Sequence, residues 1–99
     1  MRIYVAGPMT GFPNLNFPAF HEAARRLRAA GHEVVNPAEI NADPSTGWVE
    51  CMRADIRELV TCDAIHLLPG WERSRGATLE VHIAKTLGFE VTTHEEVTA

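Results

Sequence analysis

Short runs rich in β-branched residues alternate with longer segments of helical periodicity, and this alternation is the feature that most narrows the possible folds. Strands that alternate with helices are typical of βαβ units around a parallel sheet. We therefore predict a flavodoxin-like (Rossmann-like) α/β fold, in which a four-stranded parallel sheet lies between three main helices. Strands are expected at residues 2–6, 32–37, 64–69 and 89–93, and helices at about 17–30, 48–60 and 75–87.

The length of 99 residues suits a single domain spanning positions 1–99. Its composition, 45% hydrophobic and 22% charged, is that of an ordinary globular protein. No apolar run approaches the roughly 18 residues that a membrane helix needs. The apolar run among the first residues is too short for a signal peptide. We therefore expect a cytoplasmic protein in which Cys51 and Cys62 are free thiols.

Charge and histidine placement limit the kinds of partner. The net charge is -4, and the only basic cluster is formed by Arg25, Arg26 and Arg28, which argues against extended nucleic-acid binding. The five histidines are scattered, so no metal site is expected. A small-molecule partner, with no cofactor and no membrane contact, fits these observations better.

Two of the expected helices carry an acid inside their apolar stripe. At about 100° per residue, Glu80 and Asp55 fall among the apolar positions of the last and the middle helix. A buried carboxylate is costly unless it is paired, protonated or used in chemistry. For either acid alone, a backbone N–H or an arginine such as Arg53 or Arg57 is an equal alternative, but two such acids favour a functional site. The stripe of the last helix contains Ala77, Leu79, Val81, Ile83, Ala84 and Leu87.

The loops after the first and third strands are expected to meet at one edge of the sheet, where α/β folds bind ligands. In the first loop, Gly7, Pro8 and Gly11 suit a wall built largely from backbone, although a plain connection to the next helix is the alternative. Residues 37–47 are expected to form a further loop, with a turn at its Asp-Pro pair.

The second loop enters the last helix through Ser74, Arg75 and Gly76. Free N–H groups and the helix dipole could hold a phosphate there, while Ser74 also suits an ordinary N-cap. Met9 and Trp71, together with the neighbouring Phe12, can stack on a heterocycle. Core lids and subunit contacts are equal alternatives for these apolar loop residues.

Two carboxyl groups, one nucleophilic and one able to carry a proton, are what cleavage of a glycosidic bond requires. In that scheme Glu80 attacks the anomeric carbon as an ionised nucleophile. Asp55 donates a proton to the departing group or fixes its orientation.

Three segments, IYVAGPMTG, MRADIRELVTCDAIHLL and SRGATLEVHIAKTLG, together resemble the nucleoside 2-deoxyribosyltransferase superfamily, which includes the deoxynucleoside 5′-monophosphate N-glycosidases. The resemblance covers nearly the whole chain and is greatest to small phage and bacterial members. The matching motif positions are Tyr4 and Gly7, Asp55 and Asp63, and Gly76 and Glu80.

The resemblance implies that Glu80 is the nucleophile, Asp55 the acid that contacts the sugar or base, and Tyr4 the residue that orients the nucleophile. It places Ser74 where the monophosphate hydrolases use a serine on the 5′-phosphate, whereas Pro8 replaces another phosphate-contacting serine. Asp63, at the amino end of the third strand, is interpreted as structural.

The implied activity is hydrolysis or transfer at the N-glycosidic bond of a nucleoside or its 5′-monophosphate, in a homodimer or larger homo-oligomer. Two other functions stay open. A nucleotide-binding sensor or accessory module would keep the pocket without turnover. A purely structural oligomer would tie up Glu80 with an internal partner and have no pocket beside it.

Overall fold

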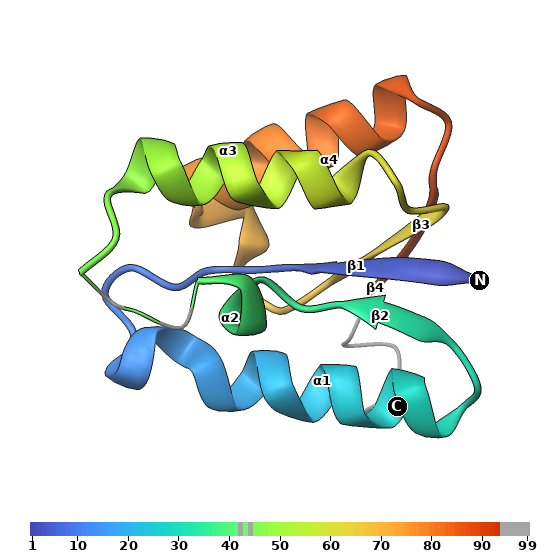
Figure 1. Cartoon of the computed structure of the whole chain (residues 1–99), viewed down its shortest axis with the longest axis horizontal. Coiled ribbons are helices and arrows are strands. Elements are labelled where there is room, and N and C mark those ends of the chain that lie inside the picture. The colour runs from blue at the N-terminus through green and yellow to red at the C-terminus, as the bar shows by residue number, and fades with distance from the viewer. Residues whose placement is uncertain (42, 44, 94–99) are drawn as a thin grey trace.

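The computed structural model describes residues 1–41, 43 and 45–93, which form one parallel sheet with helices on both faces (Figure 1). One layer consists of α1 (Phe17–Ala29), and the other of α3 (Trp48–Leu59) and α4 (Arg75–Thr86). The predicted flavodoxin-like α/β fold is confirmed. The strands, in spatial order, are β2 (Glu33–Val35), β1 (Arg2–Ala6), β3 (Ala64–Leu67) and β4 (Glu90–Thr93).

The strand order reverses between β1 and β3, where the site is expected. β1 pairs with both β2 and β3, and Ala6 lies opposite Leu67 at the carboxyl end of the sheet. The connection after β1 leads to α1 on one face, and the segment after β3 leads to α4 on the other (Figure 1). Connections that diverge in this way leave a crevice at the strand ends.

Alternation along β1 divides the core into two apolar layers. Tyr4 and Ala6 face the cluster beneath α3 and α4, which also contains Leu59 and Val81. Val5 belongs to the cluster beneath α1. Because successive strand side chains point to opposite faces, the position of Tyr4 in β1 directs its side chain towards α4.

At the end of the sheet opposite the crevice, Arg2 holds neighbouring segments together. Its backbone N–H donates to the Asp63 carboxylate over 3.1 Å, and its guanidinium bonds Glu33 and Thr61. These contacts tie β1 to the beginning of β2 and β3. They support the structural interpretation of Asp63, at the end of the sheet away from the crevice.

A short helix, α2 (Pro37–Ile40), replaces part of the loop expected at 37–47, so β2 ends before the predicted residue 37. The Asn36 side chain caps this helix by accepting from the Ala38 N–H, and Pro37 occupies the first turn. Two 3-10 turns, η1 (Pro13–Asn16) and η2 (Trp71–Arg73), also lie in segments expected to be loops.

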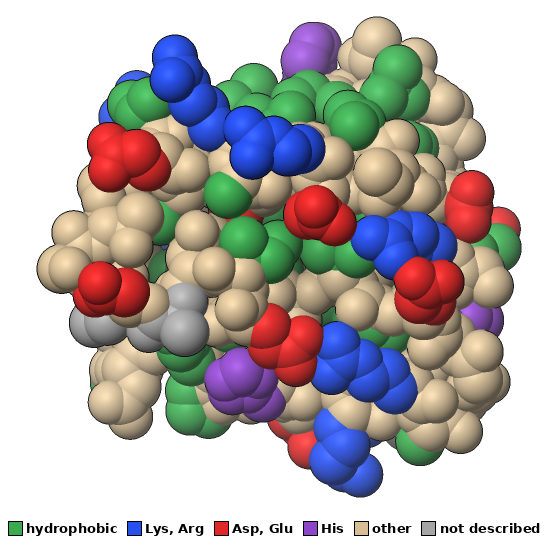
Figure 2. All heavy atoms as spheres, viewed as in Figure 1, with side chains coloured by type: hydrophobic (Ala, Val, Ile, Leu, Met, Phe, Trp, Pro, Cys, Tyr) green, Lys and Arg blue, Asp and Glu red, His purple; other side chains and the backbone are tan. Residues whose placement is uncertain are grey.

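The exposed apolar side chains lie mainly on α3 and α4, where Figure 2 shows apolar surface above a mixture of acidic and basic groups. Leu79 and Leu87 are exposed, contrary to their expected place on the buried stripe, because the sheet and α3 cover only part of α4. Among the described residues, no helix is long and apolar enough to cross a bilayer.

Gly7→Ala is expected to destabilise the fold by about 1–3 kcal/mol, because a Cβ at this position would lie 2.7 Å from the Cβ of Leu68. Gly47→Ala is a suitable control, since its Cβ would meet only the flexible Glu50 carboxylate, at 3.2 Å. Urea denaturation monitored by circular dichroism measures both variants. Equal midpoints for Gly7→Ala and the wild type would contradict the close packing at Gly7.

Candidate active site

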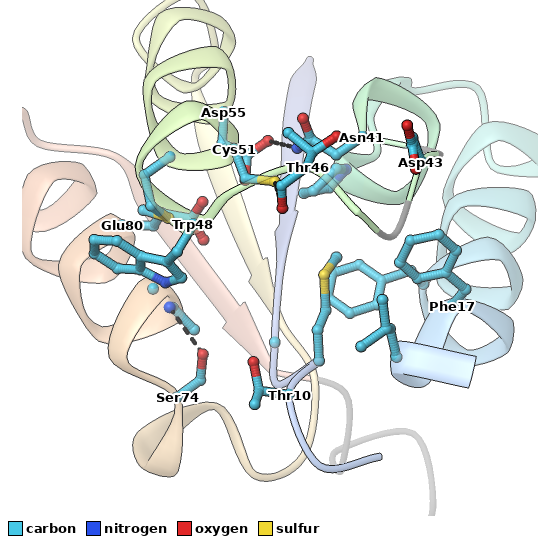
Figure 3. A pocket seen from close by; sticks show the side chains of 18 residues that line it. Thr10, Phe17, Asn41, Asp43, Thr46, Trp48, Cys51, Asp55, Ser74 and Glu80 are labelled. Atoms are coloured by element: carbon cyan, nitrogen blue, oxygen red, sulfur yellow. Dashed lines mark hydrogen bonds between the residues drawn. The ribbon is translucent and has the colours of Figure 1, made fainter. Parts of the chain in front are cut away.

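A cavity of about 210 Å³ opens at the carboxyl ends of β1 and β3. Figure 3 shows Trp48 and Glu80 on one side of it and Phe17 on the other. This volume suits a compact ligand, since pockets for drug-sized molecules usually exceed about 300 Å³. The walls are formed by Gly7, Met9, Thr10, Leu15, Phe17, Phe20, Pro37, Asn41, Asp43, Thr46, Trp48, Cys51, Met52, Asp55, Ser74, Gly76, Ala77 and Glu80.

Glu80 lies in the second turn of α4 and is only 5% exposed. Its Oε2 accepts a hydrogen bond of 2.5 Å from the hydroxyl of Tyr4. Burial, with a smaller contribution from the charge of Asp55, raises the pKa of Glu80 to about 8, and the Tyr4 hydrogen bond opposes this rise. The Glu80 carboxyl group is therefore mainly protonated near neutral pH and loses its proton near pH 8.

Tyr4 lies behind Glu80 and does not line the cavity. Its side chain is fully buried, and this burial, with the nearby charges of Glu80 and Asp55, keeps its pKa well above the ordinary value. The hydroxyl consequently stays protonated and donates to Glu80. This geometry supports the orienting role that the resemblance implied for Tyr4.

Asp55 lies in the middle of α3 and is 6% exposed. Its Oδ1 accepts a hydrogen bond of 2.6 Å from the side-chain amide of Asn41. Burial raises the pKa of Asp55 to about 6, and the Asn41 hydrogen bond limits this rise. The sequence left open an arginine such as Arg53 or Arg57 as the partner of this acid. Both arginines are exposed, and the side-chain amide of Asn41 is the partner that the structure shows.

The two acids act as an electrostatic pair within one cavity. Each is more easily ionised when the other is neutral, because their charges repel in a poorly solvated space. Between about pH 6 and pH 8 the pair therefore holds mainly one proton and one negative charge.

The cavity beside Glu80 contradicts the hypothesis of a purely structural oligomer, which required a buried acid without a pocket.

The beginning of α4 forms another part of the wall. The Ser74 hydroxyl caps the helix by accepting from the Ala77 N–H, 3.1 Å away. The first helical hydrogen bond runs from the Thr78 N–H to the Ser74 carbonyl, which leaves the earlier N–H groups of Arg75 and Gly76 for a ligand. Both expected roles of Ser74, helix cap and cavity wall, are compatible with this arrangement.

Gly76 permits the close approach of α4 to α3. A Cβ at this position would lie 3.1 Å from the sulfur of Met52. The glycine is therefore required by packing as well as by its place at the helix start.

Four predicted binding residues do not line the cavity. Pro8 is buried and its carbonyl accepts from the Asn16 amide, 2.9 Å away, while Gly11 adopts a positive φ of 87° in the turn beyond it. Trp71 packs against the core cluster beneath α4. The guanidinium of Arg75 stacks on Trp48, 3.8 Å from the ring centroid. Of these residues, Arg75 contacts the wall residue Trp48 from outside the cavity, and Gly11 is exposed.

Several wall residues were not predicted as part of the site. Phe17 and Phe20, in the first two turns of α1, line the cavity because this helix begins at its lip. That lip contains three consecutive left-handed residues, Asn14, Leu15 and Asn16, of which Leu15 lines the cavity. The sequence signal that could have pointed to Asn41 is the Asn36-Pro37 pair, which is typical of a helix start and precedes α2, the helix that Asn41 ends.

No group of three or more metal-ligating side chains that could hold an ion occurs among the described residues.

Glu80→Gln is expected to stabilise the folded state increasingly as the pH rises from about 5 to about 9. The folded pKa, about 8, exceeds the ordinary value of 4.5, so the folded protein binds more protons than the unfolded chain in this window. The free energy of unfolding of the wild type therefore falls as pH rises, by up to about 5 kcal/mol from this group. Urea denaturation at pH 5, 7 and 9 measures the difference.

The exposed Glu72 provides a matched control, since Glu72→Gln should follow the wild-type pH dependence. Parallel stability curves for Glu80→Gln and the wild type would contradict the burial of an ionisable Glu80.

The comparisons with known proteins agree with this architecture. Residues 1–93 match the model of the family described as "Domain of unknown function (DUF4406)". A 2-deoxyribosyltransferase from Bacillus psychrosaccharolyticus superposes with a TM-score of 0.72 at 22% identity, over 94% of this chain and 71% of that one. This likeness confirms, at the level of the fold, the resemblance inferred from the sequence.

A second relative is the 4-dedimethylamino-4-oxo-anhydrotetracycline transaminase of Streptomyces rimosus, which is 30% identical over 74 residues. The match covers 74% of this chain but only 21% of the transaminase, so the chain spans about a fifth of that protein's length. The family match extends over nearly the whole chain, and the protein belongs to the DUF4406 family.

Proposed function

We propose that this protein cleaves the N-glycosidic bond of a nucleoside or its 5′-monophosphate through a covalent glycosyl intermediate on Glu80. The observation that carries the proposal is the placement of two buried carboxyl groups, Glu80 and Asp55, on the wall of one cavity. The fold shared with a 2-deoxyribosyltransferase supports the same class of chemistry.

In the first step, the Glu80 oxygen that is not bonded to Tyr4 attacks C1′ of the sugar. A C1′–O bond forms while the C1′–N bond breaks, and the bonding electrons leave with the base. Asp55 supplies the proton that the departing base takes up. Negative charge in a poorly solvated cavity stabilises the positive charge that develops on the sugar.

In the second step, a water molecule attacks C1′ and Asp55, now ionised, takes its proton. The C1′–O bond to Glu80 breaks and the carboxylate is released. An incoming base that attacks in place of water gives transfer instead of hydrolysis. Both routes return Asp55 and Glu80 to their starting protonation states.

The hydrogen-bond partners favour this division of roles. Productive chemistry requires the negative charge on Glu80 and the single proton of the pair on Asp55. The Tyr4 hydroxyl, which donates to Glu80, is better matched to the ionised form of that carboxyl group. The raised pKa values of the two acids leave one proton on the pair near neutral pH, mainly on Glu80 in the free protein, and attack requires this proton to lie on Asp55 instead.

The cavity walls suit the parts of a nucleotide. Apolar and aromatic side chains, among them Met9, Phe17 and Trp48, form a surface on which a flat base can pack. The beginning of α4, with Ser74 and the free N–H of Gly76, offers a place for a 5′-phosphate. The small volume favours a single nucleotide over a polymer.

A nucleotide-binding sensor without turnover is the second candidate. Pro8 favours it, because a proline provides no hydroxyl for the phosphate and its carbonyl is already bonded to Asn16. In either case we expect a homodimer or larger assembly, for which the exposed Val49, Val60 and Leu87 provide apolar surface.

Glu80→Gln is expected to lower the release of free base by at least about 10³-fold, because the amide cannot act as the nucleophile. Chromatography of reactions with a panel of nucleosides and their 5′-monophosphates measures the released base. Glu72→Gln should retain wild-type rates. Binding without base release in the wild type favours the sensor, and the absence of binding would contradict both candidates.

Ser74→Asp is expected to lower the preference for a monophosphate over its nucleoside by at least about 10-fold, because a carboxylate at this position repels the phosphate. Aspartate is as good an N-cap as serine, so α4 should remain intact. The ratio of kcat/KM for the two substrates measures the preference, and Ser74→Thr serves as the control. An unchanged ratio would place the phosphate elsewhere.

A further inference from the structure

Asn41 lines the cavity and forms a hydrogen bond with Asp55, the expected acid. It lies where α2 ends, is half-buried, and donates its side-chain amide to Oδ1 of Asp55 (Figure 3). We infer that Asn41 is a positioning residue, which holds Asp55 so that the transferable proton lies on Oδ2. This inference rests on the proposed function for its chemical meaning, but the contact itself can be tested without a substrate.

The short helix α2 gives Asn41 a fixed origin. The Asn41 N–H donates to the Pro37 carbonyl over 2.9 Å, and the cap of the same helix, Asn36, bonds the ring of His21 in α1. The helix also contacts both α1 and α3. The amide therefore reaches Asp55 from a segment that is also anchored to α1, on the other side of the sheet from α3.

The chemistry of the two groups determines the position of the proton. The NH₂ of an asparagine can only donate, so Oδ1 of Asp55 acts as the acceptor in this contact. When Asp55 is neutral, its own proton is then expected on Oδ2, the oxygen available to the ligand. Tyr4 acts in the same way on Glu80, since it occupies one oxygen and leaves the other to react.

The same hydrogen bond makes Asp55 a usable acid. Burial alone favours the protonated form, whereas a donated N–H favours the carboxylate that remains after proton transfer. The other titratable groups near Asp55 are Glu80 in α4, Tyr4 in β1 and Cys51 one turn earlier in α3. Asp43 also lines the cavity, from the segment after α2. Glu80 is the group whose titration overlaps most with that of Asp55.

The test measures the titration of the Asp55 carboxyl carbon by ¹³C NMR in a Glu80→Gln background, which removes the overlapping acid. Asn41→Leu, which has a similar shape but no donor, should raise the Asp55 titration midpoint by about one pH unit. Asn41→Gln, which keeps an amide donor, should restore at least half of that shift. Glu72→Gln, which changes an exposed residue outside the cavity, should leave the midpoint unchanged. A midpoint that stays or falls in Asn41→Leu would overturn the inference.

A second measurement needs no substitution at Asn41. In the full wild-type chain, the side-chain amide resonances of Asn41 should shift with the same midpoint as the Asp55 carboxyl carbon. Amide resonances that do not respond to this titration would contradict the contact, even if the Asn41 variants fail to fold.

Activity measurements separate this inference from the proposed function. If a substrate is turned over, the limb of the kcat/KM profile that has the midpoint of Asp55 should move upward in Asn41→Leu by an amount similar to the NMR shift, while Glu72→Gln should keep the wild-type limb position. An unmoved limb beside a shifted carboxyl midpoint would overturn the positioning role. If no substrate is turned over, the proposed function fails, and the titrations still decide whether Asn41 orients Asp55.

Discussion

The hydrogen bond between Tyr4 and Glu80 is the contact on which the arrangement of this protein depends. It joins the central strand β1 to the helix α4 through two side chains that are almost completely removed from water. A carboxyl group in that position is costly to ionise, and the hydroxyl of Tyr4 reduces this cost without supplying a charge. The strand order, which places β1 between β2 and β3, brings the pair to the point where the crevice opens.

Asp55, the second acid, is also held by a hydrogen-bond donor from another element of the fold. Asp55 comes from α3, and its donor Asn41 comes from the end of α2, so each acid is held by a partner from another element. Four elements must therefore be in place before the two carboxyl groups face one cavity.

The sequence predicted the parts of this architecture that repeat over many residues. The alternation of strands and helices gave the fold, and the helical period revealed Glu80 and Asp55, because a buried acid interrupts a long apolar stripe. It could not predict α2, since four residues are too few to show a period, and Asn41 was missed with it. Nor could it distinguish Trp71, which packs on the core, from Phe17, which lines the cavity, because the turns after β3 and β1 decide which side chains face inwards.

Gly76 has a further consequence for the chemistry. Because it lacks a side chain, α4 lies close against Met52 of α3, and the helix spacing fixes how far apart the two carboxyl groups stand. In glycosidic cleavage this span selects the stereochemical outcome: a short span leaves room only for direct attack, whereas a longer one admits a water molecule between acid and sugar. A methyl group at position 76 would meet the sulfur of Met52 at 3.1 Å, so that side chain would have to shift. In the proposed reaction, the spacing of the two acids therefore depends in part on a residue that has no reactive group of its own.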